Sequence, residues 1–114
     1  MKISEVCELL EAKIICDTKQ DHTLVEKGYS SDLMSDVLTL DTDHLLLITG
    51  MCNLQTIRTA EMAEVRYVVF VRNKKATKEM IALATEHGIC LMESPYTMFK
   101  ASGLLFSAGL KPVY

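Results

Sequence analysis

Residues His44–Val71, HLLLITGMCNLQTIRTAEMAEVRYVVFV, decide the fold of this chain. The run His44–Thr49 is almost entirely apolar, which is typical of a strand covered on both faces. Gly50 ends that strand, Asn53 can cap a helix, and Tyr67–Val71 repeats the buried-strand pattern. Strand, helix and strand in this order predict parallel strands joined by a right-handed crossover.

The same unit repeats further along the chain. Thr77 can cap a second helix, Gly88 suits its C-terminal end, and Ile89–Met92 is a third apolar strand. Ser94 can cap a final helix over Pro95–Ser107, because proline is favoured in the first helical turn. The sequence therefore predicts an α/β fold, a single layered domain over residues 1–114 with a mainly parallel sheet flanked by helices.

The N-terminal part adds shorter segments whose order and direction in the sheet stay open. Ser4 can cap a first helix, and Gly28 marks a bulge or tight bend in a strand. The expected elements are a strand at Ala12–Cys16, a polar loop at Asp17–Thr23, a strand at Leu24–Tyr29 and a helix at Asp32–Leu40.

Composition limits the class of protein. With 114 residues, 49% apolar and 24% charged, the chain is long enough to bury a core. A net charge of −3 argues against a nucleic-acid binder, which needs clustered Lys and Arg. Glu5, Glu8 and Glu11 stand where a signal peptide would be apolar, and no run is long enough to span a membrane. We expect a cytoplasmic protein with no nucleic-acid and no membrane partner.

Ligands of parallel α/β sheets gather at the carboxyl ends of the strands, where helix N-termini present free N–H groups. Here that rim contains Gly50–Asn53, Arg72–Thr77 and Glu93–Thr97. No GxGxxG or GxxxxGK[ST] motif occurs, so a phosphate site would rest on Gly50 alone. The candidate ligand-binding residues are Gly50, Met51, Cys52, Asn53, Arg72, Asn73, Thr77 and Ser94.

Two further features could carry chemistry, and each has a simpler structural interpretation. Cys52 precedes a helix N-terminus, where the helix dipole lowers a thiol pKa, or it is an ordinary loop thiol. Asp32 and Asp36, four residues apart in a predicted helix, could pair on one face or bind a hard cation. A simpler interpretation of Asp32 is structural, because a carboxylate at a helix N-terminus interacts favourably with the helix dipole.

Metal and cofactor chemistry have no support in the sequence. The histidines His22, His44 and His87 lie in three separate segments without metal-ligand spacing, and the four cysteines form no CxxC pair. The basic residues Arg72, Lys74 and Lys75 either belong to a solvated loop or contact an anion. We therefore expect no catalytic set, no metal and no cofactor.

Four stretches resemble the DRTGG domain family, and the resemblance spans nearly the whole chain. They are GYSSDLMSDVL from Gly28, LLITG from Leu46, RTAEMAEVRYVVFV from Arg58 and SPYTMF from Ser94. The family is similar to the N-terminal domain of HPr kinase/phosphorylase and, more distantly, to the UDP-binding N-terminal domain of Mur ligases. The phosphate-binding loop of that kinase belongs to its other domain.

The resemblance implies a regulatory or accessory module rather than an enzyme. Some members are fused to CBS domains or to phosphotransacetylase, and some stand alone near hydrogenase subunits. The Asp-Arg of the family name corresponds here to Met51-Cys52, and its Thr-Gly-Gly to Val71-Arg72-Asn73, a change that should narrow the rim. Three hypotheses follow: a homodimeric module acting on a partner enzyme through protein contacts, a sensor of a nucleotide-like ligand, or an enzyme using Cys52 or Asp32 and Asp36.

Overall fold

The three central strands are buried on both faces, as their apolar runs predict. In the computed structural model, which describes residues 1–17 and 24–114, every residue of β3 (Leu45–Thr49), β4 (Tyr67–Phe70) and β5 (Cys90–Glu93) is buried. β3 pairs in parallel with β4, and β4 pairs in parallel with β5. The predicted α/β fold with a mainly parallel sheet is confirmed.

Three further strands complete a sheet of six in the described part of the chain, in the order β1-β5-β4-β3-β2-β6. β1 (Lys13–Cys16) is antiparallel to β5, whereas β2 (Lys27–Ser30) is parallel to β3. β6 (Lys111–Pro112) is parallel to β2. The sequence did not predict β6, because two residues are too few to show an alternation of apolar and polar side chains.

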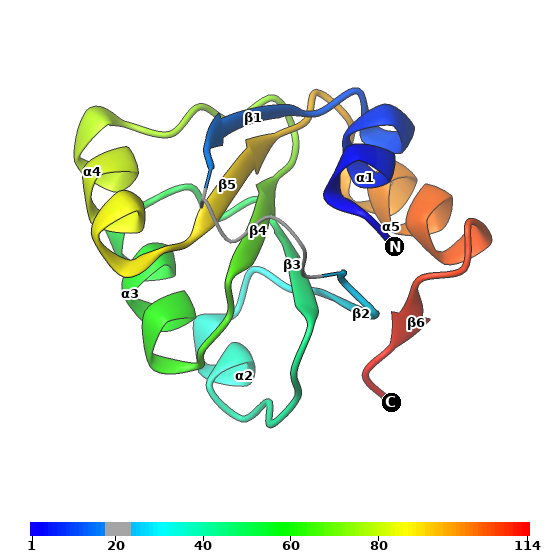
Figure 1. Cartoon of the computed structure of the whole chain (residues 1–114), viewed down its shortest axis with the longest axis horizontal. Coiled ribbons are helices and arrows are strands. Elements are labelled where there is room, and N and C mark those ends of the chain that lie inside the picture. The colour runs from blue at the N-terminus through cyan, green and yellow to red at the C-terminus, as the bar shows by residue number, and fades with distance from the viewer. Residues whose placement is uncertain (18–23) are drawn as a thin grey trace.

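Helices cover the two faces of the sheet and make two separate cores (Figure 1). One face carries α2 (Met34–Val37), α3 (Leu54–Met62) and α4 (Lys78–His87), and the other carries α1 (Ile3–Leu10) and α5 (Met98–Ser107). Side chains of β3 point alternately into the two cores. Leu45 and Leu47 pack in the core with α2, α3 and α4, and Leu46 and Ile48 pack in the core with α1 and α5. None of the helices in residues 1–17 and 24–114 has the length and apolar character that crossing a bilayer requires.

The predicted caps of α3 and α4 are confirmed. Asn53 Oδ1 accepts a hydrogen bond from Thr56 N at 3.0 Å, and Thr77 Oγ1 accepts one from Met80 N at 3.2 Å. Gly88 follows α4 with φ of 68°, the left-handed conformation expected of a C-terminal glycine.

Two predicted helix starts are wrong. α1 begins after Lys2, not Ser4, because the Glu5 side chain turns back to accept from Lys2 N. α5 begins at Met98, with Thr97 as its cap, instead of at Pro95. The buried Ser94 hydroxyl donates to the carbonyl of Leu10 at 2.7 Å and accepts from Tyr96 N at 3.2 Å, so it holds a bend at residues 95–96 that precedes the helix.

Predictions near β2 also need correction. The helix predicted over Asp32–Leu40 is the short α2, because Leu33 stays extended and its N–H donates to Ser31 Oγ. Gly28 lies in the regular parallel ladder, so the predicted bulge is wrong; a Cβ there would come within 2.8 Å of Leu110 Cδ2. The strand predicted from Leu24 begins at Lys27. Most of the predicted loop 17–23, including His22, lies outside the described residues.

Candidate functional site

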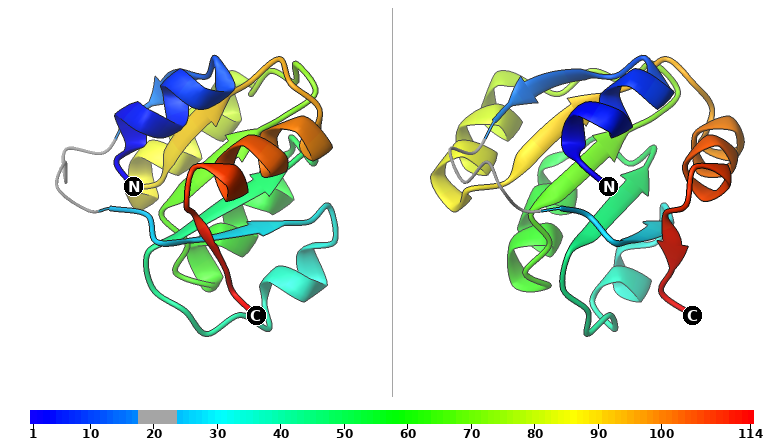
Figure 2. Two further views of the ribbon diagram at one scale, coloured as in Figure 1. Left: turned by 90° about the vertical axis from the view of Figure 1, so that its right-hand side faces the viewer. Right: turned by 45° about the vertical axis from the view of Figure 1, so that its right-hand side comes forward.

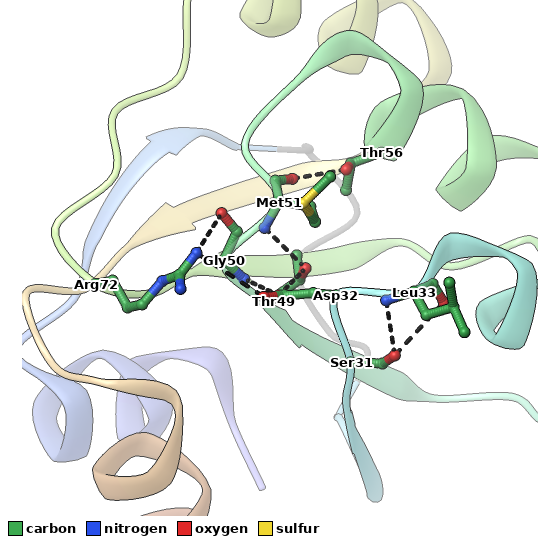
Figure 3. Close-up of polar contacts among 8 residues, drawn as sticks. All are labelled: Ser31, Asp32, Leu33, Thr49, Gly50, Met51, Thr56 and Arg72. Carbon is green, nitrogen blue, oxygen red and sulfur yellow. Dashed lines mark hydrogen bonds and ion pairs between the residues drawn. The ribbon is translucent and has the colours of Figure 1, made fainter.

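The rim predicted from the strand ends is formed by residues from three neighbouring strands. β2, β3 and β4 run parallel, so the turns that follow them lie at one edge of the sheet. These turns bring Asp32, Gly50 and Arg72 together, although the three residues are far apart in the sequence (Figure 3).

Asp32 links the end of β2 to the end of β3. Its Oδ1 accepts a hydrogen bond from Gly50 N at 2.7 Å and a second from Thr49 Oγ1 at 3.1 Å. Thr49 is fully buried, and its Oγ1 accepts in turn from Met51 N at 3.1 Å. Thr56 Oγ1 donates to the Met51 carbonyl at 2.6 Å, which fixes the turn on α3. The carboxylate therefore holds a turn that would otherwise leave donors unpaired.

Arg72 closes the rim over Gly50 (Figure 3). Its Nη2 lies 3.8 Å from Asp32 Oδ2 and donates to the Gly50 carbonyl at 3.5 Å. A Cβ at residue 50 would lie 2.5 Å from that same Nη2, so the close approach of the guanidinium needs glycine. The guanidinium thus occupies the space over Gly50, and the narrowing of the rim expected from Arg72 and Asn73 stays a prediction.

The backbone after β4 has an unusual conformation that the next loop supports. Arg72 and Asn73 have φ of 61° and 58°, in the left-handed region that favours glycine. Arg72 N donates to the carbonyl of Tyr96 at 2.7 Å, and Asn73 N donates to that of Ser94 at 3.0 Å. These are the two positions at which the DRTGG resemblance places glycines, and here two larger residues adopt the backbone conformation that favours glycine.

Glu93, which was not among the ligand-binding residues predicted from the sequence, binds the loop between β4 and α4. It is only 9% exposed, and its Oε2 accepts from Ala76 N at 2.8 Å. Lys75 Nζ lies 3.7 Å from its Oε1. A carboxylate directly after the apolar run ICLM was the available sequence signal, because a buried charge needs a partner.

The remaining predicted ligand residues use their side chains within the fold. Asn53 and Thr77 cap helices, and Ser94 ties β5 to the end of α1. Met51 is 37% exposed and lies beside the turn. The structure thus joins Gly50, Arg72, Asn73 and Ser94 through direct contacts at one rim.

The two chemical alternatives do not fit this geometry. Burial raises the pKa of the Cys52 thiol, the Glu93 carboxylate raises it further, and Lys74 only partly lowers it, so the predicted lowering by the helix N-terminus is wrong. Asp32 lies in a bend before α2, whose N-cap Leu33 is extended, while Asp36 lies in the helix, so the proposed face shared at four-residue spacing does not exist. Within residues 1–17 and 24–114, no three His, Cys, Asp or Glu side chains lie close enough to hold a metal ion.

The site is therefore a short chain of charges and backbone groups, not a catalytic constellation. Asp32 offers a carboxylate, Arg72 a half-exposed guanidinium, and Lys74 and Lys75 add positive charge beside it. Such a set can bind an anion or a protein surface, but it provides no nucleophile activated by a neighbouring base.

Among solved structures, the chain is similar to the CBS and DRTGG domains of the regulatory region of a Clostridium perfringens pyrophosphatase, complexed with the activator diadenosine tetraphosphate. The TM-score is 0.81 at 17% sequence identity, over 98% of this chain and 48% of that one. This chain thus spans about half the length of that structure, and the likeness supports a DRTGG-like fold. No family model and no curated protein matches the chain.

Proposed function

We propose that this chain is a DRTGG-like regulatory or accessory module, a single domain over residues 1–114, that acts through protein contacts as a homodimer. It catalyses no reaction itself and accompanies a metabolic or hydrogenase-type enzyme in the cytoplasm. The relation to the N-terminal domain of HPr kinase/phosphorylase is part of this proposal. The similar fold in the regulatory region of a pyrophosphatase supports the assignment as a DRTGG-like regulatory module.

The observation that carries the proposal is the closure of the rim by its own residues. The Gly50 amide, which an anion could use, and the Gly50 carbonyl and Asp32 carboxylate, which the hydroxyls of a nucleotide sugar could use, are bound to one another and to Arg72. A ligand would have to break these contacts first. Contact with other proteins needs no such rearrangement.

Light scattering tests the homodimer. At high micromolar concentration we expect the full chain to have twice the mass of one copy, because a module that acts through protein contacts needs a stable assembly surface. The mass should return to that of one copy on dilution if the interface is of moderate affinity. A single-copy mass throughout the concentration range would contradict the proposal.

A second function, nucleotide sensing, is favoured by one observation. The Arg72–Asp32 pair is open to solvent, with side chains 49% and 42% exposed, so it adds little stability and can exchange for a phosphate. Lys74 and Lys75 follow in the same loop. A guanidinium that leaves Asp32 could then bind phosphate oxygens in bidentate geometry.

Thermal unfolding with a panel of adenine and uridine nucleotides, including diadenosine tetraphosphate, tests this second function. A ligand at ten times its Kd should add about 1.4 kcal/mol, a rise in Tm of roughly 5 °C. Arg72→Ala should abolish the rise, whereas Arg58→Ala, an equal loss of charge on the exposed side of α3, should preserve it. No rise with any nucleotide at millimolar concentration would exclude sensing at this rim.

A further inference from the structure

α5 presents a pair of aromatic side chains to solvent on the face of the molecule away from α3 and α4. Phe99 is 89% exposed and Phe106 is 68% exposed, whereas Ala101 and Leu105 of the same helix are buried against the sheet. The two phenylalanines are seven residues apart, so they share one face and lie about 10.5 Å apart along the axis. In the left view of Figure 2, α5 crosses in front of the sheet, with α1 on the same side of the sheet and β6 running across below α5.

An apolar groove of about 360 Å³ lies beside these side chains, between α5 and the strands β2 and β6. Its lining includes Gly28, Ile48, Leu110 and both phenylalanines. Gly103 also lines it and lies between the two phenylalanines, and a Cβ at this position would meet no atom within 4 Å. The centre of the helix face is thus open space bordered by two aromatic rings.

A patch of this kind marks an interaction surface. Single exposed apolar side chains are ordinary, but two large aromatic rings adjoining an apolar groove form one contiguous area. The neighbouring edge strand β6 is two residues long and contains Pro112, so an added β-strand would find few free backbone groups. The contact surface is therefore the helix face and the groove.

We propose that this face of α5 docks onto the same face of a second copy of the chain, about a two-fold axis between Ser102 and Gly103. The pattern of aromatic, small, small and aromatic residues at 99, 102, 103 and 106 is the same in both directions. Two antiparallel α5 helices therefore place Phe99 of one copy beside Phe106 of the other, and the small residues let the helices approach closely. A two-fold interface requires this self-complementarity.

The exposed area supports a second copy as the occupant. Given their exposure, the two rings offer roughly 300 Å² per copy, more than a third of the about 800 Å² per partner in a standard interface. From Pro95 to Tyr114 the sequence has no acidic residue, so these residues bring no carboxylate to the contact, and the charged residue that lines the groove is Lys111. Lys100 lies over the Tyr96 ring at 3.8 Å, to the side of the aromatic pair.

The inference rests on the homodimer of the proposed function and specifies its surface. Its test uses Gly103→Glu, which places a charge at the centre of the interface in each copy. The substitution should fold, because its Cβ meets open space and glutamate favours a helix more than glycine does. The double variant Phe99→Glu/Phe106→Glu removes the rings. Controls are Ala82→Glu on α4 and Met62→Glu, which removes a 63% exposed apolar side chain from α3.

Sedimentation or light scattering over a dilution series measures the dimer Kd, and circular dichroism checks the fold. We expect Gly103→Glu and the double variant each to raise the Kd at least about 30-fold, as for loss of an interface hot spot, and both controls to leave it unchanged. A wild-type dimer whose Kd is unaffected by the α5 changes would overturn this inference and leave the proposed function standing. A wild-type monomer would overturn both.

Discussion

Asp32→Ala should lower the free energy of unfolding by about 2 kcal/mol, although Asp32 lies at the surface. The substitution removes the acceptor of two hydrogen bonds, from Gly50 N and from the hydroxyl of the fully buried Thr49. Hydrogen bonds to a charged group are stronger than neutral ones, and a buried donor left without an acceptor is costly. Urea unfolding of the wild-type and variant chains gives the difference directly.

Two matched variants separate the hydrogen bonds from the charge. Asp32→Asn keeps an oxygen acceptor in the same place, so we expect it to retain about half of the lost stability. Asp36→Ala removes an exposed carboxylate from α2 and should change stability by less than about 0.5 kcal/mol. Equal losses for Asp32→Ala and Asp36→Ala would show that Asp32 does not hold the turn after β3.

The central part of the fold could be predicted from the sequence because its determinants are local. The runs that form β3 and β4 are almost entirely apolar. Asn53 and Thr77 cap the N-termini of α3 and α4, and Gly88 caps the C-terminus of α4, so each acts within one turn of its helix. Such patterns need only a short window of sequence. The parallel order then follows from the rule for strand–helix–strand units.

The features that escaped prediction depend on contacts between distant segments. Ser94 and Pro95 form a sound local start for a helix, but the Ser94 hydroxyl is bound to the carbonyl of Leu10, 84 residues away. α2 begins later than predicted for a similar reason, because the Asp32 side chain accepts from Gly50 N after the neighbouring strand β3, and Leu33 N donates to Ser31 Oγ. The sequence of one segment cannot show that one of its side chains will hydrogen-bond to a distant segment and so be unable to serve its own helix.

The same reasoning explains why the rim was located but its chemistry was not. Its position follows from the strand ends, and Gly50, Arg72 and Asn73 were all named from the sequence. The role of Asp32 depends on β2 lying beside β3, which the sequence left open. Cys52 shows the opposite error, since the helix N-terminus favours its thiolate locally while burial and Glu93 together raise its pKa. Burial of a side chain is a property of the assembled fold, so the local rule gave the wrong direction.

Alkaline pH should destabilise the wild-type chain more than a Cys90→Ala variant. Burial in β5 raises the pKa of the Cys90 thiol to about 12 from an ordinary value of 9.0, and electrostatic interactions with Asp17, Cys16 and Cys7 add to the rise. The unfolded chain therefore loses this proton at lower pH than the folded chain. The stability is fully present below about pH 9 and is lost as pH rises toward 12, at about 1.4 kcal/mol per unit.

Between pH 8 and pH 10.5 we expect the wild type to lose roughly 2 kcal/mol more than Cys90→Ala. Cys90→Ala is less stable at pH 8 because it leaves a cavity beside a residue that is 1% exposed, but that cost does not change with pH. Met92→Ala, a cavity in the same strand without a titrating group, should differ from the wild type by a constant amount. Urea unfolding at each pH distinguishes the two variants, and a constant difference between wild type and Cys90→Ala would mean that the buried thiol does not control alkaline stability.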